Sequence, residues 1–311
     1  MNPAPSVIFF TTLSGLGYGL AFWLAIARAF GAIPAETPWF GAISLGVALA
    51  LVSAGLLSST AHLGHPERAW RAFSQWRTSW LSREGVAAVV TFIPLGLLWL
   101  AWMLGATGGI WAFVALLGAA LALITVYCTG MIYQSLKPIQ AWATGWTTPI
   151  YLLFALMTGA HAVAALAAWF GYGASWQASA ALILTVALAI AKLMYWRSVD
   201  TATPFSTPES ATGLGRFGKV RQLEAPHVTE NYITREMGFK VARKHAAKLR
   251  MIVYAIGFGV PTLVAMLMLI TGPSALLATI GVLAAMVGAI AERWLFFAEA
   301  KHAVMNFYGE R

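Results

Sequence analysis

The sequence predicts an all-α integral membrane protein, a bundle of eight transmembrane helices with both termini in the cytoplasm. Hydrophobic residues make up 59% of the 311 residues and charged residues only 10%, whereas about a quarter of the residues in a soluble domain are charged. The apolar residues gather in runs of about 20, the length at which a helix crosses a bilayer. The runs are rich in Ala and Leu and lack the alternation of outer-membrane strands. This composition excludes a soluble enzyme, a disordered chain and a nucleic-acid-binding protein.

The eight runs form one integral membrane domain over residues 1–311. The expected spans are residues 7–27, 39–63, 84–103, 111–135, 147–169, 177–196, 249–270 and 275–297. Short connections with almost no charge join the first span to the second, the third to the fourth, the fifth to the sixth and the seventh to the eighth. Aromatic residues suited to anchoring at the membrane interface stand at or near many span ends. They are Trp39, Trp111, Trp146, Tyr151, Trp169, Trp176, Trp196 and Trp294.

The three remaining connections and the C-terminal tail carry nearly all the cationic side chains. Four arginines lie between the second and third spans, and residues 197–248 form a long basic loop before the seventh span. Lys137, Lys301 and Arg311 belong to the same side. Since Lys and Arg are enriched in cytoplasmic loops, this side and both termini are predicted to face the cytoplasm. Arg28, which follows the first span, would by itself favour the opposite orientation, but the cations on this side are far more numerous.

The segment between the second and third spans is the first candidate site. His62 stands at the end of one expected span and Glu84 opens the next. Because antiparallel helices joined by a modest connection usually pack together, both side chains can share one depth near the headgroups. A histidine and a carboxylate there suit the proton transfers of quinone chemistry. The alternative is structural: His62 ends a helix, Glu84 interacts with a helix dipole, and Ser82 is the N-cap.

The same segment is both basic and aromatic. Arg68, Arg71 and Arg77 are expected to position either this site or a partner protein. Trp76 and Trp80 are candidates for the entrance of the quinone site, with interfacial anchoring as the alternative.

The long loop at residues 197–248 is expected to dock a cytoplasmic partner. Its second half, residues 229–248, predicts an amphipathic helix, and binding to anionic lipid is the alternative role. The cations assigned to docking are Arg71, between the second and third spans, and Arg216, Lys219, Arg221 and Arg235 in this long loop.

Few other ionisable residues lie within the spans. His161 is expected to be a packing histidine, while Glu292 is expected to pair with Lys192 or Arg293. The single cysteine, Cys128, cannot form an internal disulfide or hold an iron–sulfur cluster, and no metal site is expected in this chain.

Three stretches resemble a known family. The segment 61–84, with its His-Leu-Gly, Pro, Arg-Ala and Leu-Ser-Arg-Glu elements, resembles the membrane-anchor subunit of dimethyl sulfoxide reductases. Residues 131–142 and 216–238 resemble the anchor subunit of the cytoplasmic membrane-bound sulfite dehydrogenase, a branch of the same superfamily. The eight-span layout agrees with this resemblance over most of the chain.

The resemblance implies an anchor in the bacterial inner membrane within a three-subunit complex. One partner carries a molybdenum bis-pyranopterin cofactor, and a ferredoxin-like partner carries iron–sulfur clusters. The anchor exchanges electrons with ubiquinone or menaquinone. The family residues tied to the quinol site match His62 and Glu84 in this sequence.

Three functions remain open at this stage. The first is an anchor that passes electrons from cytoplasmic sulfite oxidation to quinone. The second is a menaquinol-oxidising anchor of a dimethyl sulfoxide reductase-type complex. The third is a small-molecule permease, which broken helices and paired polar residues at mid-membrane would favour. The ionisable residues gather instead at one membrane edge, as an interfacial quinone site requires.

Overall fold

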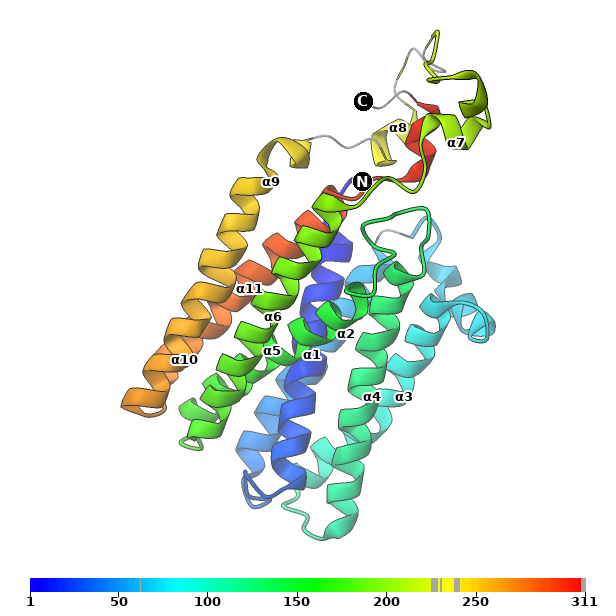
Figure 1. Ribbon diagram of the computed structural model, residues 1–311. Helices are drawn as coiled ribbons and strands as arrows, with labels where there is room; N and C mark the ends of the chain where they lie inside the picture. The colour runs from blue at the N-terminus through cyan, green and yellow to red at the C-terminus, as the bar shows by residue number, and fades with distance from the viewer. Residues whose placement is uncertain (62, 225–228, 230, 238–240, 309–311) are drawn as a thin grey trace.

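The computed structural model describes residues 1–61, 63–224, 229, 231–237 and 241–308. Within them it contains eight helices long and apolar enough to cross a membrane, as the sequence predicts (Figure 1). The first six spans are α1 (Pro5–Ala29), α2 (Pro38–Thr60), α3 (Trp80–Met103), α4 (Gly109–Gln134), α5 (Thr147–Trp169) and α6 (Ser175–Thr201). α11 (Ala275–Ala298) provides the eighth span.

The seventh span changes its winding along its length. α9 (Val241–Ile252) leads into a wider π-helical segment, η3 (Val253–Gly259), and then into α10 (Val260–Thr271). Residues 229–248 were expected to form one amphipathic helix. The structure has α8 (Tyr232–Met237) and the start of α9 within this range. Short helices complete the connections: η1 (Pro66–Gln75), α7 (Pro208–Thr212), η2 (Gly215–Phe217) and η4 (Ala303–Phe307).

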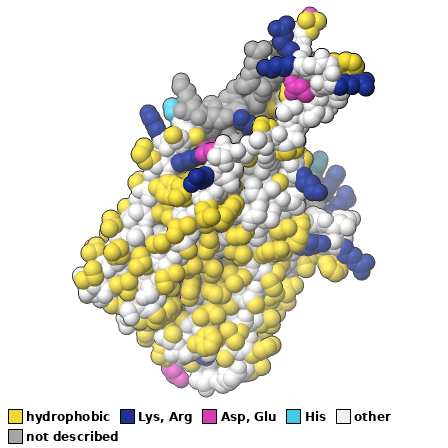
Figure 2. Space-filling model, viewed as in Figure 1, with side chains coloured by type: hydrophobic (Ala, Val, Ile, Leu, Met, Phe, Trp, Pro, Cys, Tyr) yellow, Lys and Arg dark blue, Asp and Glu magenta, His cyan; other side chains and the backbone are white. Residues whose placement is uncertain are grey.

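One end of the bundle carries η1, the segments after α4 and α6, and both chain termini (Figure 1). The Met1 ammonium donates a hydrogen bond to the Ala300 carbonyl at 2.8 Å, which ties the two terminal segments together. Lys and Arg gather at this end, whereas the body of the bundle is hydrophobic (Figure 2). We call it the basic end. Its expected exposure to the cytoplasm stays a prediction.

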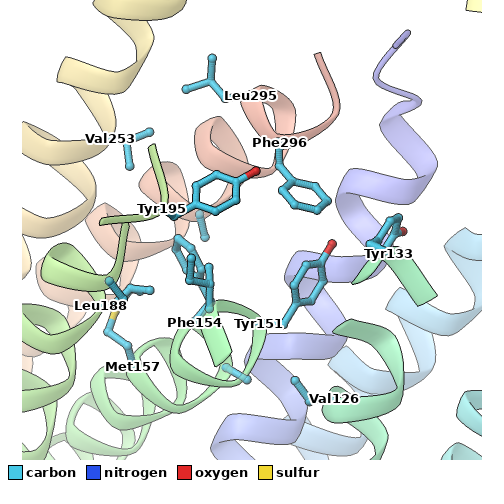
Figure 3. Close-up of a cluster of buried hydrophobic side chains, with 14 of the residues drawn as sticks. Val126, Tyr133, Tyr151, Phe154, Met157, Leu188, Tyr195, Val253, Leu295 and Phe296 are labelled. Carbon is cyan, nitrogen blue, oxygen red and sulfur yellow. The ribbon is translucent and has the colours of Figure 1, made fainter. Parts of the chain in front are cut away.

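The helices α1 and α5 lie at the centre and are the most buried spans. α1 packs on α2, α4 and α5, and α5 also packs on α6 and α11. An aromatic cluster fills the bundle toward the basic end, where the ring centroids of Tyr133 and Tyr151 lie 5.5 Å apart, with Phe296 beside them (Figure 3).

The crossing of α1 and α5 depends on two glycines. A Cβ atom on Gly19 would lie 1.8 Å from the Ala155 carbonyl oxygen, and one on Gly159 would lie 2.2 Å from the Gly19 carbonyl carbon. In a bilayer, close backbone contact of this kind holds helices together, because the surrounding lipid is as apolar as the side chains.

We expect Gly19→Ala to destabilise the bundle by roughly 1–3 kcal/mol or more, because the methyl group forces the two central helices apart. Thermal unfolding in detergent measures this change. Gly96→Ala is the matched control, since a Cβ there meets nothing within 4 Å and alanine favours the helix by about 1 kcal/mol. Equal melting temperatures for the two variants would contradict the assigned role of the crossing.

Candidate functional site

The carboxyl group of Glu84 lies inside the protein, where α3 packs on α4. The helix α3 begins at Trp80, and the N-cap is Ser79, whose hydroxyl accepts a hydrogen bond from the Ser82 backbone N–H. The prediction of Ser82 as the N-cap is therefore wrong. Because the helix starts one turn earlier than expected, Glu84 stands on its second turn and is only 4% exposed.

Packing of α3 against α4 positions this carboxyl group. Glu84 shares the buried face of α3 with Ala88 and Thr91, at the spacing of one helix face. The Thr129 hydroxyl of α4 hydrogen-bonds to Glu84 Oε1. Two turns deeper, the hydroxyls of Thr91 and Thr125 lie 3.0 Å apart. Threonines in α4 therefore provide the polar partners of this helix pair.

The connection before α3 is held against the helix by Arg83 and Ser82. The Arg83 guanidinium donates to the backbone carbonyls of Trp76 at 3.0 Å and Arg77 at 2.7 Å, and it lies 4.2 Å from the Trp80 ring centroid. The Ser82 hydroxyl donates to the Ala72 carbonyl. These contacts fix the path of the chain between η1 and α3.

The remaining residues predicted around the quinone site are spread over the surface. Arg68, Arg77 and Trp76 are exposed, and Arg77 lies against the Trp76 ring. Trp80 is half-buried and packs edge-on against Tyr127 of α4, with ring centroids 5.9 Å apart. His62 lies outside the described residues, so its expected proximity to Glu84 stays a prediction. The cations assigned to docking are all exposed: Arg71, Arg216, Lys219, Arg221 and Arg235.

A second polar group lies between α6 and α11. The Lys192 ammonium is 2.6 Å from Glu292 Oε1, and Arg293 Nε is 2.9 Å from the other carboxylate oxygen. All three side chains are at most 3% exposed. Glu292 thus pairs with both cations, where the sequence left the choice open. Two cations and one anion leave this ion triad with one positive charge.

A small cavity lies between Arg293 of the ion triad and Thr129 of α4. Its volume is about 20 Å³, room for about one water molecule. Tyr151 and Arg293 both line the cavity and lie against each other, with the Arg293 guanidinium carbon 3.9 Å from the centroid of the Tyr151 ring. The polar side chains of its wall are Thr11, Thr12, Ser14, Thr129, Tyr151, Thr158 and Arg293.

His161 lies deeper in the bundle, where its Nε2 atom is 3.0 Å from the Thr185 hydroxyl. This contact agrees with the expected packing histidine. Among the described residues no three His, Cys, Asp or Glu side chains gather closely enough to hold a metal ion.

Almost the whole sequence matches a known protein family. The family model described as DMSO reductase anchor subunit (DmsC) matches residues 1–298. The chain belongs to this anchor-subunit family. It is also 33% identical to the C subunit of sulfite dehydrogenase from Allochromatium vinosum, and the match covers 99% of each protein.

Two other relatives of this anchor subunit match over a shorter part. One is the YnfH chain of an anaerobic dimethyl sulfoxide reductase of Escherichia coli, 32% identical over 37% of this chain and 41% of its own. The other is the C chain of the anaerobic dimethyl sulfoxide reductase of Haemophilus influenzae, 28% identical over 36% of this chain and 40% of its own. The resemblance predicted from the sequence is confirmed at the level of the family.

Proposed function

We propose that this anchor subunit binds a quinone near the start of α3 and exchanges protons with it, while the electrons travel through a partner subunit. The observation that supports this most is the Glu84 carboxyl group, buried one turn inside an apolar helix. An ionisable side chain at such a depth is costly, so a functional role is the default expectation. Quinone takes up two electrons and two protons to give quinol, and a carboxyl group can carry these protons.

His62 is the second proton-transfer group in this proposal. It follows the end of α2 and precedes η1 in the chain. Arg68, Arg77, Trp76 and Trp80 lie in the same connection or at the start of α3, and the exposed ring of Trp76 suits the level of the lipid headgroups. Quinone dissolves in the bilayer, so in this proposal it approaches the start of α3 from the lipid.

The partners in this proposal are an iron–sulfur subunit and a molybdenum-containing catalytic subunit at the basic end. Exposed cations on η1, around η2 and on α8 provide a positive surface for them. With that end in the cytoplasm, sulfite oxidation there would send electrons to quinone. Electron flow from sulfite to quinone is supported by a relative named for sulfite dehydrogenase, which matches over 99% of this chain. The dimethyl sulfoxide reductase relatives match over only about a third of it.

Purification of the whole complex from its native membrane tests this proposal. We expect molybdenum and iron–sulfur clusters to accompany the chain, and sulfite to reduce a short-chain quinone analogue. His62→Leu should keep the complex assembled and its dye-linked sulfite oxidation intact, while quinone reduction falls by about 10²-fold or more. Unchanged quinone reduction in this variant would contradict the site. If the complex instead oxidises quinol with a sulfoxide and shows no activity with sulfite, the electrons flow the opposite way, from quinol to the substrate.

A further inference from the structure

The hydroxyl group of Thr129 has one proton and two acceptors within reach. Its oxygen lies 3.1 Å from the backbone carbonyl of Thr125, one turn earlier in α4, and it hydrogen-bonds to Oε1 of Glu84 across the helix pair. The Thr125 carbonyl also faces the backbone N–H of Thr129, in the regular i to i−4 pattern of an α-helix. The hydroxyl proton is therefore free to serve the carboxyl group.

The helix itself holds the Thr129 oxygen in place. A threonine has few rotamers in a helix because its Cβ is branched, and contact with the carbonyl four residues earlier selects one of them. In this rotamer Oγ1 lies toward α3, where it contacts Glu84. Both side chains are buried. Thr129 thus holds the carboxyl group by one oxygen, Oε1, and leaves Oε2 for the acid proton.

A second pair of hydroxyls in the same two helices makes a polar contact without any ionisable group. The hydroxyls of Thr91 and Thr125 lie 3.0 Å apart. Each is also within hydrogen-bond distance of a carbonyl in its own helix, those of Ala87 at 2.7 Å and Leu121 at 2.9 Å. One hydroxyl can donate to its own carbonyl while the other donates to the first. Pairing of α3 with α4 therefore does not require a carboxyl group, and Glu84 adds one nearer the basic end.

The other titratable side chains near Glu84 are ordinarily uncharged at neutral pH. Those that interact with it electrostatically come from α1, α4 and α5, and they are Tyr18, Cys128, Tyr133 and Tyr151. The neighbouring cation, Arg83, directs its guanidinium to two backbone carbonyls of the connection before α3. Among the described contacts, Thr129 is the side chain that hydrogen-bonds to the carboxyl group.

Ionisation of Glu84 strengthens the hydrogen bond from Thr129. A hydrogen bond to an ionised group is roughly twice as strong as one between neutral groups, and the low dielectric of the interior increases its strength. The bond therefore stabilises the carboxylate that remains after a proton has left more than the acid from which it came. Thr129 eases proton release from a buried carboxyl group without exchanging a proton itself.

We propose that Thr129 is a positioning residue for proton transfer between Glu84 and quinone. In quinone reduction the Oε2–H bond breaks and its electron pair stays on the carboxylate, while an O–H bond forms at a quinone oxygen. The two electrons come from the iron–sulfur subunit, and solvent supplies the second proton and restores the acid. This role rests on the proposed function, but the hydrogen bond is measurable without quinone.

Infrared spectroscopy of the full chain in lipid, at a pH that protonates Glu84, tests the hydrogen bond. The C=O band of the acid is assigned by its loss in Glu84→Gln. A hydrogen bond to the carbonyl oxygen weakens the C=O bond, so Thr129→Val should move the band to higher wavenumber and Thr129→Ser should return it. Thr91→Val removes a hydroxyl of the deeper pair and should leave the band unchanged. If the unchanged chain has its band where a carboxylic acid without a hydrogen bond absorbs, the proposal is overturned whether or not the variants fold.

Quinone reduction by the assembled complex tests the role in proton transfer. Thr129→Val should lower its rate about tenfold, the effect of about one hydrogen bond, whereas Thr129→Ser and Thr91→Val should keep it near that of the unchanged complex. An unshifted band or full quinone reduction in Thr129→Val would overturn the proposal. If the band shifts as expected but the unchanged complex reduces no quinone, the proposed function is refuted while the hydrogen bond at Glu84 stands.

Discussion

Replacing Glu292 with leucine is expected to prevent stable folding of the anchor. The carboxylate lies between Lys192 and Arg293, and all three side chains are almost completely buried. Without it, two cations stay in an apolar environment with no counter-charge. Breaking a buried ion pair in this way costs roughly 3–5 kcal/mol, a large part of the stability of a typical domain. Yield of the chain in the membrane and its thermal unfolding in detergent measure the effect.

Two comparison variants separate lost pairing from lost volume. Lys192→Met removes one cation and leaves Glu292 and Arg293 as a neutral pair, so its loss of stability should be smaller. The triple variant Lys192→Met/Glu292→Leu/Arg293→Met replaces all three charges with apolar groups of similar size, which is often neutral or stabilising. If Glu292→Leu unfolds at the same temperature as the unchanged chain, the triad does not stabilise the bundle.

The spans could be predicted from the sequence because the length and hydropathy of a run decide whether it crosses a bilayer. Each of the eight expected runs overlaps a helix of the structure, although the ends differ by a few residues. The end of α3 shows why such differences matter. Ser79 and Ser82 are both suitable N-caps, and the choice of Ser79 moves Glu84 from the helix start to its buried second turn.

The partners of the buried charges could not be read from the sequence. Lys192 and Glu292 are 100 residues apart in the chain, and only the assembled bundle brings their side chains to 2.6 Å. Thr129 gives no signal in an apolar run, because a threonine in a helix usually bonds to its own backbone, as Thr129 also does at 3.1 Å to Thr125. Its second contact, to Glu84, arises from helix packing.

Replacing Glu84 with glutamine is expected to abolish most quinone turnover while the complex stays assembled. Glutamine has nearly the same shape, and its amide oxygen can accept the hydrogen bond from Thr129. It cannot take up or release a proton at neutral pH. General acid–base groups contribute about 10²–10⁴-fold to a rate, so quinone reduction in the assembled complex should fall by about that factor. Dye-linked oxidation at the catalytic subunit should stay unchanged.

The matched control is Glu67→Gln, which removes a carboxylate from the same connection. Glu67 is exposed and lies 3.0 Å from His65 and 3.7 Å from Arg68, and an exposed ion pair contributes little to stability. We expect its quinone turnover to match that of the unchanged complex. Equal losses in the two variants would indicate a general effect of charge at the basic end. Full turnover in Glu84→Gln would leave the buried carboxyl group with a structural role, since the proton would then reach quinone by another route.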